Sequence, residues 1–294
     1  MKEGELDAFI GENGHFSTIF DFSAHILSEG EHGWYDAPPV DFKEWRKAIT
    51  DSQLRVQKCG LEANIIENHD EPRGVSHYIP EADVSDTSKK MLAAVNVMLR
   101  GLPFIYQGQE LGMTNVAFHS IIDDCSTLDE YQVALDAGLT PESAFKAVVP
   151  YSRDNARTPF QWDATANAGF TTGTPWLKVN PNYSDINAAE QANRPDSMYH
   201  WYKELIALRK NSEYKDVVVY GEVVPYKEEQ TNLMAYYRKG TDRTLLVIAN
   251  YQHDAQDVVL PGTYKKVLMN NLETLDLNGD ILHMPGYQVV IFEM

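Results

Sequence analysis

The chain has 294 residues, of which 43% are hydrophobic and 23% are charged, and its formal net charge is −18. This composition is that of an ordinary soluble globular protein, and the length suits one large domain with a second, smaller one. An acidic surface repels phosphate groups, which argues against nucleic acid or an anionic membrane as a partner.

The sequence carries no targeting or membrane-spanning signal. No apolar run reaches 18 residues, and residues 1–5 lack the features of a signal peptide, so we expect a cytoplasmic location. Cys59 and Cys125 have no metal-ligand spacing and form no disulfide framework, which predicts two free thiols.

The first hundred residues alternate between predicted strands and predicted helices. Residues 16–22 are rich in aromatic side chains and alternate in polarity, which indicates a strand. Residues 30–39 predict a loop, and Asp41 caps a predicted helix that runs to residue 60. A short apolar strand is expected over residues 63–67.

A second helix and a third strand follow. Ser85 or Asp86 starts the helix, Gly101 and Pro103 end it, and residues 104–106 form the next strand. This alternation produces a parallel sheet with right-handed crossover connections.

Residues 114–193 form a long excursion with one short helical segment at 128–135. An irregular insertion of this length is usually functional or a lid. A strong amphipathic helix is expected over residues 196–210.

The pattern changes to short strands in the last third of the chain. The predicted strands lie at 217–220, 234–237, 245–249, 258–260 and 289–292. Asn278 and Gly279 are a hairpin signal between strands. We therefore expect residues 213–294 to form an antiparallel β-sandwich domain with its own core, after a first domain over residues 1–212.

The polar residues that end the predicted strand at 63–67 are the first candidate for a functional site. Asn68, His69 and Asp70 follow directly on the apolar run, and a parallel β/α barrel presents its chemistry at such strand ends. Taken alone, the three residues fit a polar loop after a core strand equally well.

Four segments in the same order give a specific resemblance. Residues 67–73, 103–113, 153–163 and 168–173 together make the chain similar to the α-amylase superfamily of glycoside hydrolases, and most like its oligo-1,6-glucosidase, dextran glucosidase and α-glucosidase branch. The resemblance implies a fold of mixed class: the last three strand–helix units of a (β/α)8 TIM barrel, followed by a C-terminal antiparallel β-sandwich.

The resemblance also implies that two catalytic groups lie outside this sequence. In the family, the nucleophilic Asp and the general-acid Glu come before the strand that corresponds to residues 16–22. We therefore expect this chain to be the C-terminal part of a retaining exo-acting α-glucosidase for short gluco-oligosaccharides, and to be inactive alone. The same resemblance implies no metal ion and no cofactor here.

Three residues take roles from the resemblance. Asp70 corresponds to the catalytic carboxylate that stabilises the positively charged transition state without attacking the sugar. His69 corresponds to a histidine that binds sugar hydroxyls, and Arg153 to an arginine that holds the non-reducing glucose. Without the resemblance, a structural role for His69 would be the stronger interpretation.

The neighbouring residues leave several interpretations open. Arg157 is expected in a structural ion pair with Asp154 or Asp163, or on a loop carbonyl. Trp162 and Phe170 either line a sugar site or pack in a core.

An acid pair of Asp70 with Glu110 is disfavoured, because family members keep that glutamate beside a dedicated pair of acids. Glu67 is the other carboxylate near a predicted strand end.

Some positions depart from the branch. Residues 21–25 replace an aromatic-Glu-His pattern, His77 stands where arginine is usual, and residues 27–33 lack the arginine-rich loop of sucrose isomerases. A fragment of a sucrose isomerase or glucosyltransferase is therefore the weaker interpretation. A non-catalytic carbohydrate-binding or scaffold remnant is the other alternative.

Three parallel strands cannot close a barrel that needs eight. The sequence therefore predicts two unpaired sheet edges and an exposed apolar face, which would cause self-association or a loosely packed N-terminal half.

Overall fold

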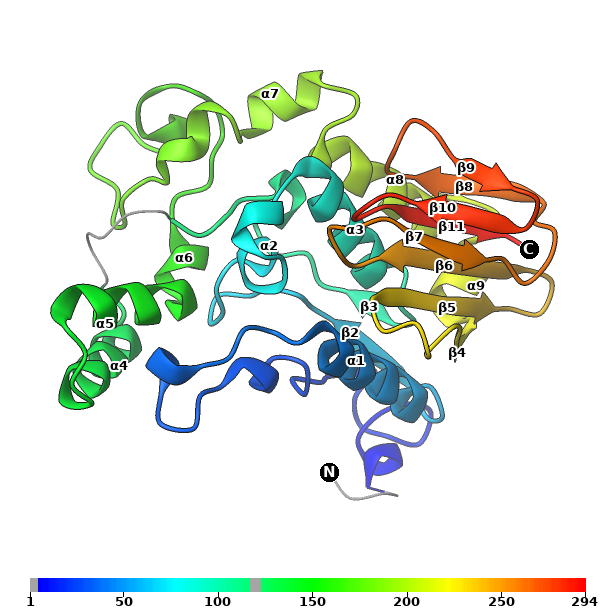
Figure 1. Cartoon of the computed structure of the whole chain (residues 1–294), viewed down its shortest axis with the longest axis horizontal. Coiled ribbons are helices and arrows are strands. Elements are labelled where there is room, and N and C mark those ends of the chain that lie inside the picture. Colours follow the sequence, from blue (N-terminus) through cyan, green and yellow to red (C-terminus); the bar gives the residue numbers. More distant parts are fainter. Residues whose placement is uncertain (1–4, 117–122) are drawn as a thin grey trace.

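The computed structural model describes residues 5–116 and 123–294. Residues 1–4, where the sequence predicts no signal peptide, and residues 117–122 of the predicted excursion lie outside the described residues. Figure 1 shows a central strand–helix region, with the antiparallel β domain at one end and helices α4 (Cys125–Asp136) and α5 (Pro141–Val148) at the other.

Three short parallel strands form the central sheet. They are β1 (Thr18–Phe20), β2 (Leu61–Asn64) and β3 (Leu102–Pro103), in the order β1-β2-β3. Helices α1 (Phe42–Val56) and α3 (Asp86–Val97) connect them, which confirms the predicted alternation of strands and helices.

The strands end earlier than the sequence predicts. Residues 65–67 are buried but belong to no strand. The apolar run that predicted a strand there reflects burial and not pairing with a neighbouring strand. Likewise β3 stops at Pro103, although the Phe104 N–H still donates to the Asn64 carbonyl at 2.8 Å. The predicted strand at 16–22 is reduced to the three residues of β1. The polar segment after residue 67 therefore leaves the sheet as a loop.

Both predicted helix starts are confirmed. The Asp41 carboxylate accepts a hydrogen bond from the Glu44 N–H at 3.0 Å and caps α1. Ser85 and Ser88 form a reciprocal capping box at the start of α3. These caps satisfy backbone donors that the first helical turn leaves without partners.

The excursion holds more helix than the sequence predicts. Besides α4 and α5 it contains α6 (Asp154–Arg157) and α7 (Ala188–Asn193), and α2 (Gly74–Tyr78) precedes it. Helices α4 and α5 pack on each other through a small core of Ala134, Ala144 and Val148. Small apolar residues spaced along two short helices gave too weak a periodic signal. The helix predicted over 196–210 is α8 (Met198–Asn211).

The C-terminal domain is a two-layer antiparallel β-sandwich. One sheet has the order β4-β5-β6-β11-β8 and the other has the order β7-β10-β9. The strand bounds are β4 (Glu222–Pro225), β5 (Leu233–Lys239), β6 (Thr244–Asn250), β7 (Gln256–Val259), β8 (Lys266–Asn270), β9 (Asp276–Asn278), β10 (Ile281–Met284) and β11 (Val289–Glu293). The hairpin at Asn278 and Gly279 is confirmed, with Gly279 at a positive φ of 66°.

One predicted strand is wrong. Residues 217–220 belong to helix α9 (Lys215–Tyr220), which packs against α8. Val217 and Val218 are buried, so packing overrides the preference of β-branched residues for strands. The first strand of the domain, β4, begins only after Gly221, and the sequence did not predict it, nor β8, β9 or β10.

The five-stranded sheet is buried on both faces. Alternate residues such as Leu246 and Ile248 face the second sheet, whereas Leu245 and Val247 join the core shared with α1, α3 and α8. The core is therefore continuous across the predicted boundary at residue 212/213, and that boundary stays a prediction.

Buried polar groups also join the two regions. Arg238 of β5 is fully buried and donates to the carbonyl oxygens of Met98 and, at 2.8 Å, Gly221. The Tyr236 hydroxyl donates to the Val95 carbonyl at 2.9 Å. Since the Met98 and Val95 carbonyls lie at the end of α3, the β domain fixes the helix that precedes β3.

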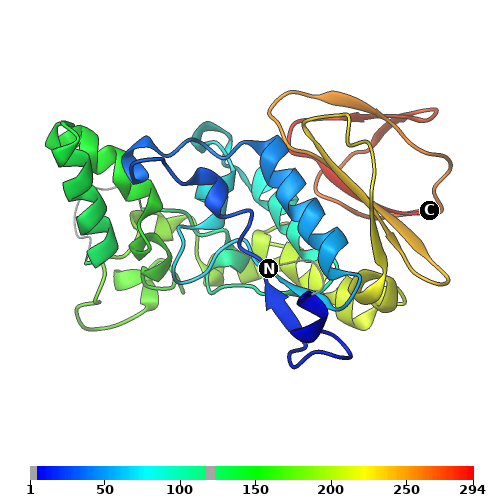
Figure 2. The same cartoon turned by 90° about the horizontal axis from the view of Figure 1, so that it is seen from below.

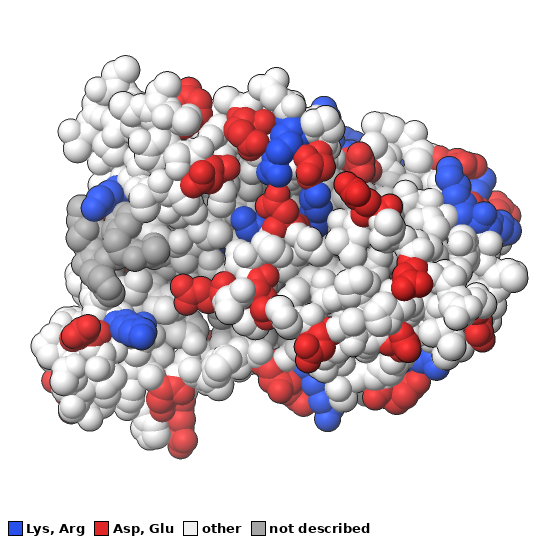
Figure 3. All heavy atoms as spheres, turned by 45° about the horizontal axis from the view of Figure 1, so that its top comes forward, with Lys and Arg blue, Asp and Glu red and all other residues white. Residues whose placement is uncertain are grey.

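The surface and the thiols agree with the composition. Acidic side chains are spread over the whole face shown in Figure 3, with basic groups among them. Cys59 and Cys125 are free, as predicted. In the described part of the chain, no helix is both long enough and apolar enough to cross a membrane.

We predict that amide exchange is fast in β1 and slow in β6 and β11. Within residues 5–116 and 123–294, the three-residue strand β1 pairs only with β2, whereas β6 and β11 are buried between two partner strands. Hydrogen-exchange mass spectrometry measures both. Equal protection at residues 18–20 and 245–249 would contradict the prediction.

Candidate functional site

A hollow of about 450 Å³ opens where β2 and β3 end. Phe20, Phe22, Ile65 and residues 104–106 line its apolar side, and residues 67–71 line its polar side. An apolar wall with a few convergent polar groups is the usual form of a small-molecule site.

Asp70 lies at the polar edge of this hollow. Its backbone N–H donates to the Asn68 side-chain oxygen at 2.7 Å, a local turn that sets the direction of the loop. Its side chain is 54% exposed and contacts His69 Nε2 at 3.2 Å. The predicted residues His69 and Asp70 therefore lie together at an accessible strand end.

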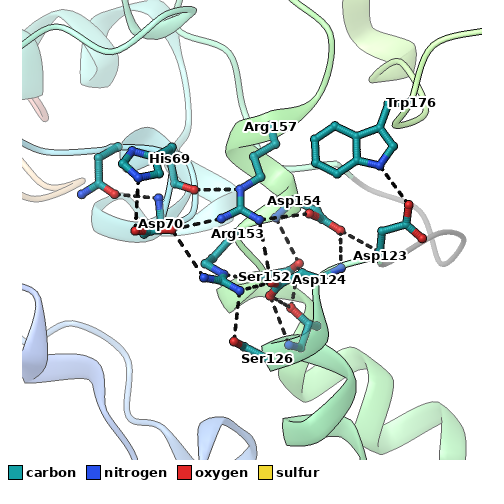
Figure 4. Close-up of polar contacts among 12 residues, drawn as sticks. His69, Asp70, Asp123, Asp124, Ser126, Ser152, Arg153, Asp154, Arg157 and Trp176 are labelled. Carbon is teal, nitrogen blue, oxygen red and sulfur yellow. Dashed lines mark hydrogen bonds and ion pairs between the residues drawn. The ribbon is translucent and has the colours of Figure 1, made fainter.

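Two arginines converge on one oxygen of Asp70. Arg157 Nη2 donates to Asp70 Oδ1 at 3.0 Å, and Arg153 Nη1 lies 3.4 Å from the same atom. Arg153 is the N-cap residue of α6 and Arg157 is its last residue, so the two arginines lie four residues apart at one side of this short helix. Figure 4 shows them between the His69–Asp70 loop and a second group of aspartates.

Asp124 is a buried carboxylate that binds this arginine pair. Its side chain is only 1% exposed, and Oδ1 accepts hydrogen bonds from Arg153 Nη2 and, at 2.9 Å, from Arg153 Nε. Its Oδ2 accepts from the Thr127 N–H and hydroxyl, which caps α4. Burial would raise the pKa of Asp124, but the hydrogen bonds from Arg153 and Thr127 outweigh it and lower that pKa.

Asp154 fixes the segment that carries Asp124. Its Oδ2 accepts the backbone N–H groups of Asp123 and Asp124 at 2.8 and 3.0 Å. Arg157 Nη1 lies 3.8 Å from both Asp154 Oδ1 and Asp124 Oδ1. The aspartates and arginines thus form one continuous network that ends at Asp70.

Glu71 is a second carboxyl group at the hollow. Burial, with smaller contributions from the charges of Asp70 and Glu29, raises the pKa of Glu71 to about 7. Its Oε1 lies 3.8 Å from Nδ1 of His25, whose own pKa burial lowers to about 4. Near neutral pH this neighbour therefore offers no positive charge to Glu71.

The structure gives Arg157 more contacts than the sequence predicts. Arg157 forms two of the predicted contacts, one with Asp154 and one, at 2.9 Å, with a loop carbonyl, that of His69. It also donates to Asp70, which the sequence did not predict. Sequence reasoning assigned Arg157 a structural role only and missed Asp124 altogether. The helical spacing of Arg153 and Arg157 was the one signal that linked the two arginines.

Other candidates lie apart from this network. Trp162 and Phe170 are 54% and 49% exposed, so of the two alternatives left open, packing in a core is wrong, and a role at a sugar site stays a prediction. Glu110 accepts from the Gly108 N–H at 2.8 Å, and Glu67 is buried in an ion pair with Arg73 at 3.2 Å.

The residues that the structure describes contain no candidate metal site. Among the described residues, no group of three or more His, Cys, Asp and Glu side chains is arranged to hold a metal ion. The network at Asp70 instead joins carboxylates to guanidinium groups.

Two family models match the chain. Residues 9–221 match the catalytic domain of α-amylase, and residues 233–291 match the C-terminal domain of the α-amylase SusG. The two matches fall on the strand–helix region and on the β-sandwich, respectively.

Known proteins match almost the whole chain, which spans about half of their length. An oligo-1,6-glucosidase of Bacillus cereus is 36% identical over 96% of this chain and 51% of its own. The structure of a trehalose-6-phosphate hydrolase of Bacillus licheniformis superposes with a TM-score of 0.91 at 33% identity, over 100% of this chain and 54% of that one. An isomaltulose synthase of a Klebsiella species gives 0.88 at 30% identity, over 98% and 53%.

We predict that Asp124→Ala lowers the free energy of unfolding by about 2 kcal/mol. The substitution removes the cap of α4 and leaves Arg153 without its buried partner. Urea denaturation measures the change, and Asp129→Ala, at an exposed position of the same helix, is the matched control. Equal stability of the two variants would refute the anchoring role.

Between about pH 4 and pH 7, ionisation of Glu71 lowers the free energy of unfolding as the pH rises. We predict that Glu71→Gln removes this pH-dependent loss. The raised pKa means that the folded protein favours the neutral carboxyl group, so its contribution is complete below the unfolded pKa of about 4.3 and is lost as the pH rises to about 7.

The free energy of unfolding of Glu71→Gln, relative to that of the unsubstituted chain, should thus rise by about 1 kcal/mol from pH 4 to pH 8, allowing for solvent screening. Urea midpoints at the two pH values measure this gain. A gain of the same size at both pH values would contradict the assignment.

Proposed function

The chain belongs to the α-amylase family of glycoside hydrolases, and we propose that it forms the C-terminal part of a retaining exo-acting α-glucosidase. Its three parallel strands are, on this proposal, the last three strand–helix units of a (β/α)8 TIM barrel. The substrates are short α-linked gluco-oligosaccharides, in line with the oligo-1,6-glucosidase similarity. A cytoplasmic location remains a prediction.

The observation that carries the proposal is the position of Asp70. It lies where a parallel strand has ended, at the rim of a hollow, and two arginines hold one of its oxygens. In β/α barrels, catalytic groups lie at this end of the parallel strands, which supports the proposal. The resemblance gives Asp70 the role of stabilising the developing positive charge on the sugar.

The other residues of the site have complementary tasks. His69 is largely exposed beside Asp70 and donates or accepts a hydrogen bond with a sugar hydroxyl. Arg153 and Arg157 place planar donors around Asp70, which orient its carboxylate and bind vicinal hydroxyls. Asp124 keeps Arg153 in place from the side away from the hollow.

Hydrolysis with retention needs a nucleophilic carboxylate and a separate carboxyl acid. On this proposal, both come from the part of the relatives that this chain does not match. The residues described here bind and orient the glucose ring, and Asp70 lowers the energy of the cationic transition state.

A fragment of a sucrose-isomerising enzyme is the second candidate. The specific observation in its favour is the superposition on the isomaltulose synthase structure over 98% of this chain. The absence of an arginine-rich segment at residues 27–33 favours hydrolysis instead.

We predict that the purified chain hydrolyses no 4-nitrophenyl α-glucoside. The chain supplies Asp70 but, on this proposal, no nucleophile and no acid. Release of 4-nitrophenol above the blank, abolished by Asp70→Ala, would contradict this account.

A fused protein tests the role of Asp70. The portion of the Bacillus cereus relative that this chain does not cover is joined ahead of residue 1. We predict that this protein hydrolyses isomaltose, and that Asp70→Asn lowers kcat roughly 100- to 1000-fold because one preorganised charge contact is lost.

Asp129→Asn is the control for this substitution, and its kcat should match that of the fused parent. A folded but inactive fusion, or one in which Asp70→Asn has no effect, would refute the proposed function.

A further inference from the structure

A separate pocket of about 300 Å³ shares no lining residue with the hollow beside Asp70. Three segments form it: parts of residues 28–40, residues 76–81, and residues 150–151. Figure 2 shows the first segment, in blue, reaching the green pair of helices α4 and α5, which its turn at Trp34–Asp36 contacts. The volume lies at the lower end for small-molecule sites and suits a ligand with a single sugar ring.

Aromatic rings form one corner of this pocket. The His77 ring meets the Tyr78 ring edge to face, with centroids 4.7 Å apart and planes at 82°. It meets the Tyr151 ring at 6.2 Å and 80°. Pro39 and Ile79 add apolar surface to the lining. Aromatic and apolar walls of this kind pack against the C–H face of a sugar ring.

Polar groups with spare hydrogen-bonding capacity lie among these rings. The Ser76 hydroxyl accepts the Asn115 N–H at 2.9 Å, and His77 Nε2 lies 3.1 Å from the Ser28 hydroxyl. Within residues 5–116 and 123–294, neither His77 Nδ1 nor the Tyr151 hydroxyl has a hydrogen-bond partner. A hydroxyl group of a ligand can pair with either, since it both donates and accepts.

The charge of the pocket selects against anions. The described residues that line it include neither lysine nor arginine, and Glu81 is their one acidic member. Burial, with a smaller contribution from the charge of His25, lowers the pKa of His77 to about 4, so its ring is neutral near pH 7. A phosphate or carboxylate would lose its hydration without gaining an ion pair, whereas a neutral polyhydroxy ligand has no such penalty.

We propose that this pocket is a second binding site, outside the catalytic hollow, for a neutral monosaccharide such as D-glucose. The choice of glucose rests on the proposed function, because hydrolysis of a gluco-oligosaccharide releases glucose. The pocket itself is defined by the contacts of Ser76, His77 and Tyr151 and does not depend on that function.

One histidine lies between the pocket and the hollow. Tyr78 lines the pocket, and its hydroxyl lies 3.3 Å from His25 Nδ1. The same nitrogen lies 3.8 Å from Oε1 of Glu71, which lines the hollow. His25 therefore borders both sites, whereas His77 lines the pocket alone. The ring signals of these two histidines distinguish a ligand in the pocket from one in the hollow.

NMR of the chain labelled with ¹³C-histidine tests the inference. The chain has nine histidines, and His77→Gln assigns the ring signal of His77 by its loss. We expect titration with D-glucose to shift this signal saturably. The shift should persist in Asp70→Asn, because Asp70 lines the hollow and not the pocket.

Two substitutions remove hydroxyl groups of the pocket. Tyr151→Phe and Ser76→Ala should each raise the Kd for glucose roughly 2- to 10-fold, because one hydrogen bond is lost. Tyr220→Phe, at an exposed ring outside the pocket, is the matched control and should leave the Kd unchanged. Circular dichroism confirms that each variant folds, and Tyr151→Phe alone decides if Ser76→Ala does not fold.

A His77 signal that does not shift saturably overturns the inference. A Kd that Tyr151→Phe leaves unchanged also overturns it, because the sugar then binds elsewhere. Glucose 6-phosphate tests the class of ligand, and its binding in the pocket should be weaker by about tenfold or more, because no cation pairs with the phosphate. Equal affinity for the two sugars overturns the assignment to a neutral ligand.

Activity separates this inference from the proposed function. Glucose binding at His77 together with an inactive fused protein refutes the proposed function and leaves the pocket as a sugar site. An active fused protein whose His77 signal does not respond to glucose refutes the second site alone.

Discussion

The orientation of the Asp70 carboxylate depends on one network of ion pairs and hydrogen bonds that begins at Asp154 and ends at Asp70. Asp154 holds the backbone of Asp123 and Asp124, Asp124 holds Arg153, and Arg153 and Arg157 converge on Asp70. Each guanidinium is shared between a buried carboxylate and an exposed one, so the exposed group is fixed without being covered. This arrangement keeps a carboxylate oriented and still open to a ligand, which is what binding of a cationic transition state requires.

The rest of the fold explains how distant parts of the chain meet there. Parallel strands end at a common edge, which places the loop after β2 beside the loop after β3. Helix α6 reaches the same edge from the long excursion. The β-sandwich fixes α3 through Arg238 and Tyr236, so the segment leading into β3 is held from outside the sheet.

Sequence patterns predicted the parts of the fold that local chemistry decides. The caps at Asp41 and Ser85 are local hydrogen bonds, and both helix starts were predicted from them. Val217 and Val218 were misassigned because their helix is stabilised by packing on α8, which no local pattern encodes.

At the candidate site, Asp70, His69 and Arg153 were predicted from the resemblance that four ordered blocks of residues carry, whereas Asp124 was missed. Its partner Arg153 lies 29 residues away in the sequence, and an isolated aspartate before a helix indicates only a cap.

The most direct measurement is a crystal structure of the fused protein, in which the uncovered portion of the Bacillus cereus relative precedes residue 1, with a cationic, glucose-configured iminosugar. The account predicts the sugar ring in the hollow, with Asp70 within hydrogen-bonding distance of its hydroxyls, about 2.6–3.2 Å, and Arg153 or Arg157 on a neighbouring hydroxyl. An iminosugar bound elsewhere, or bound in the hollow without contact to Asp70, would contradict it.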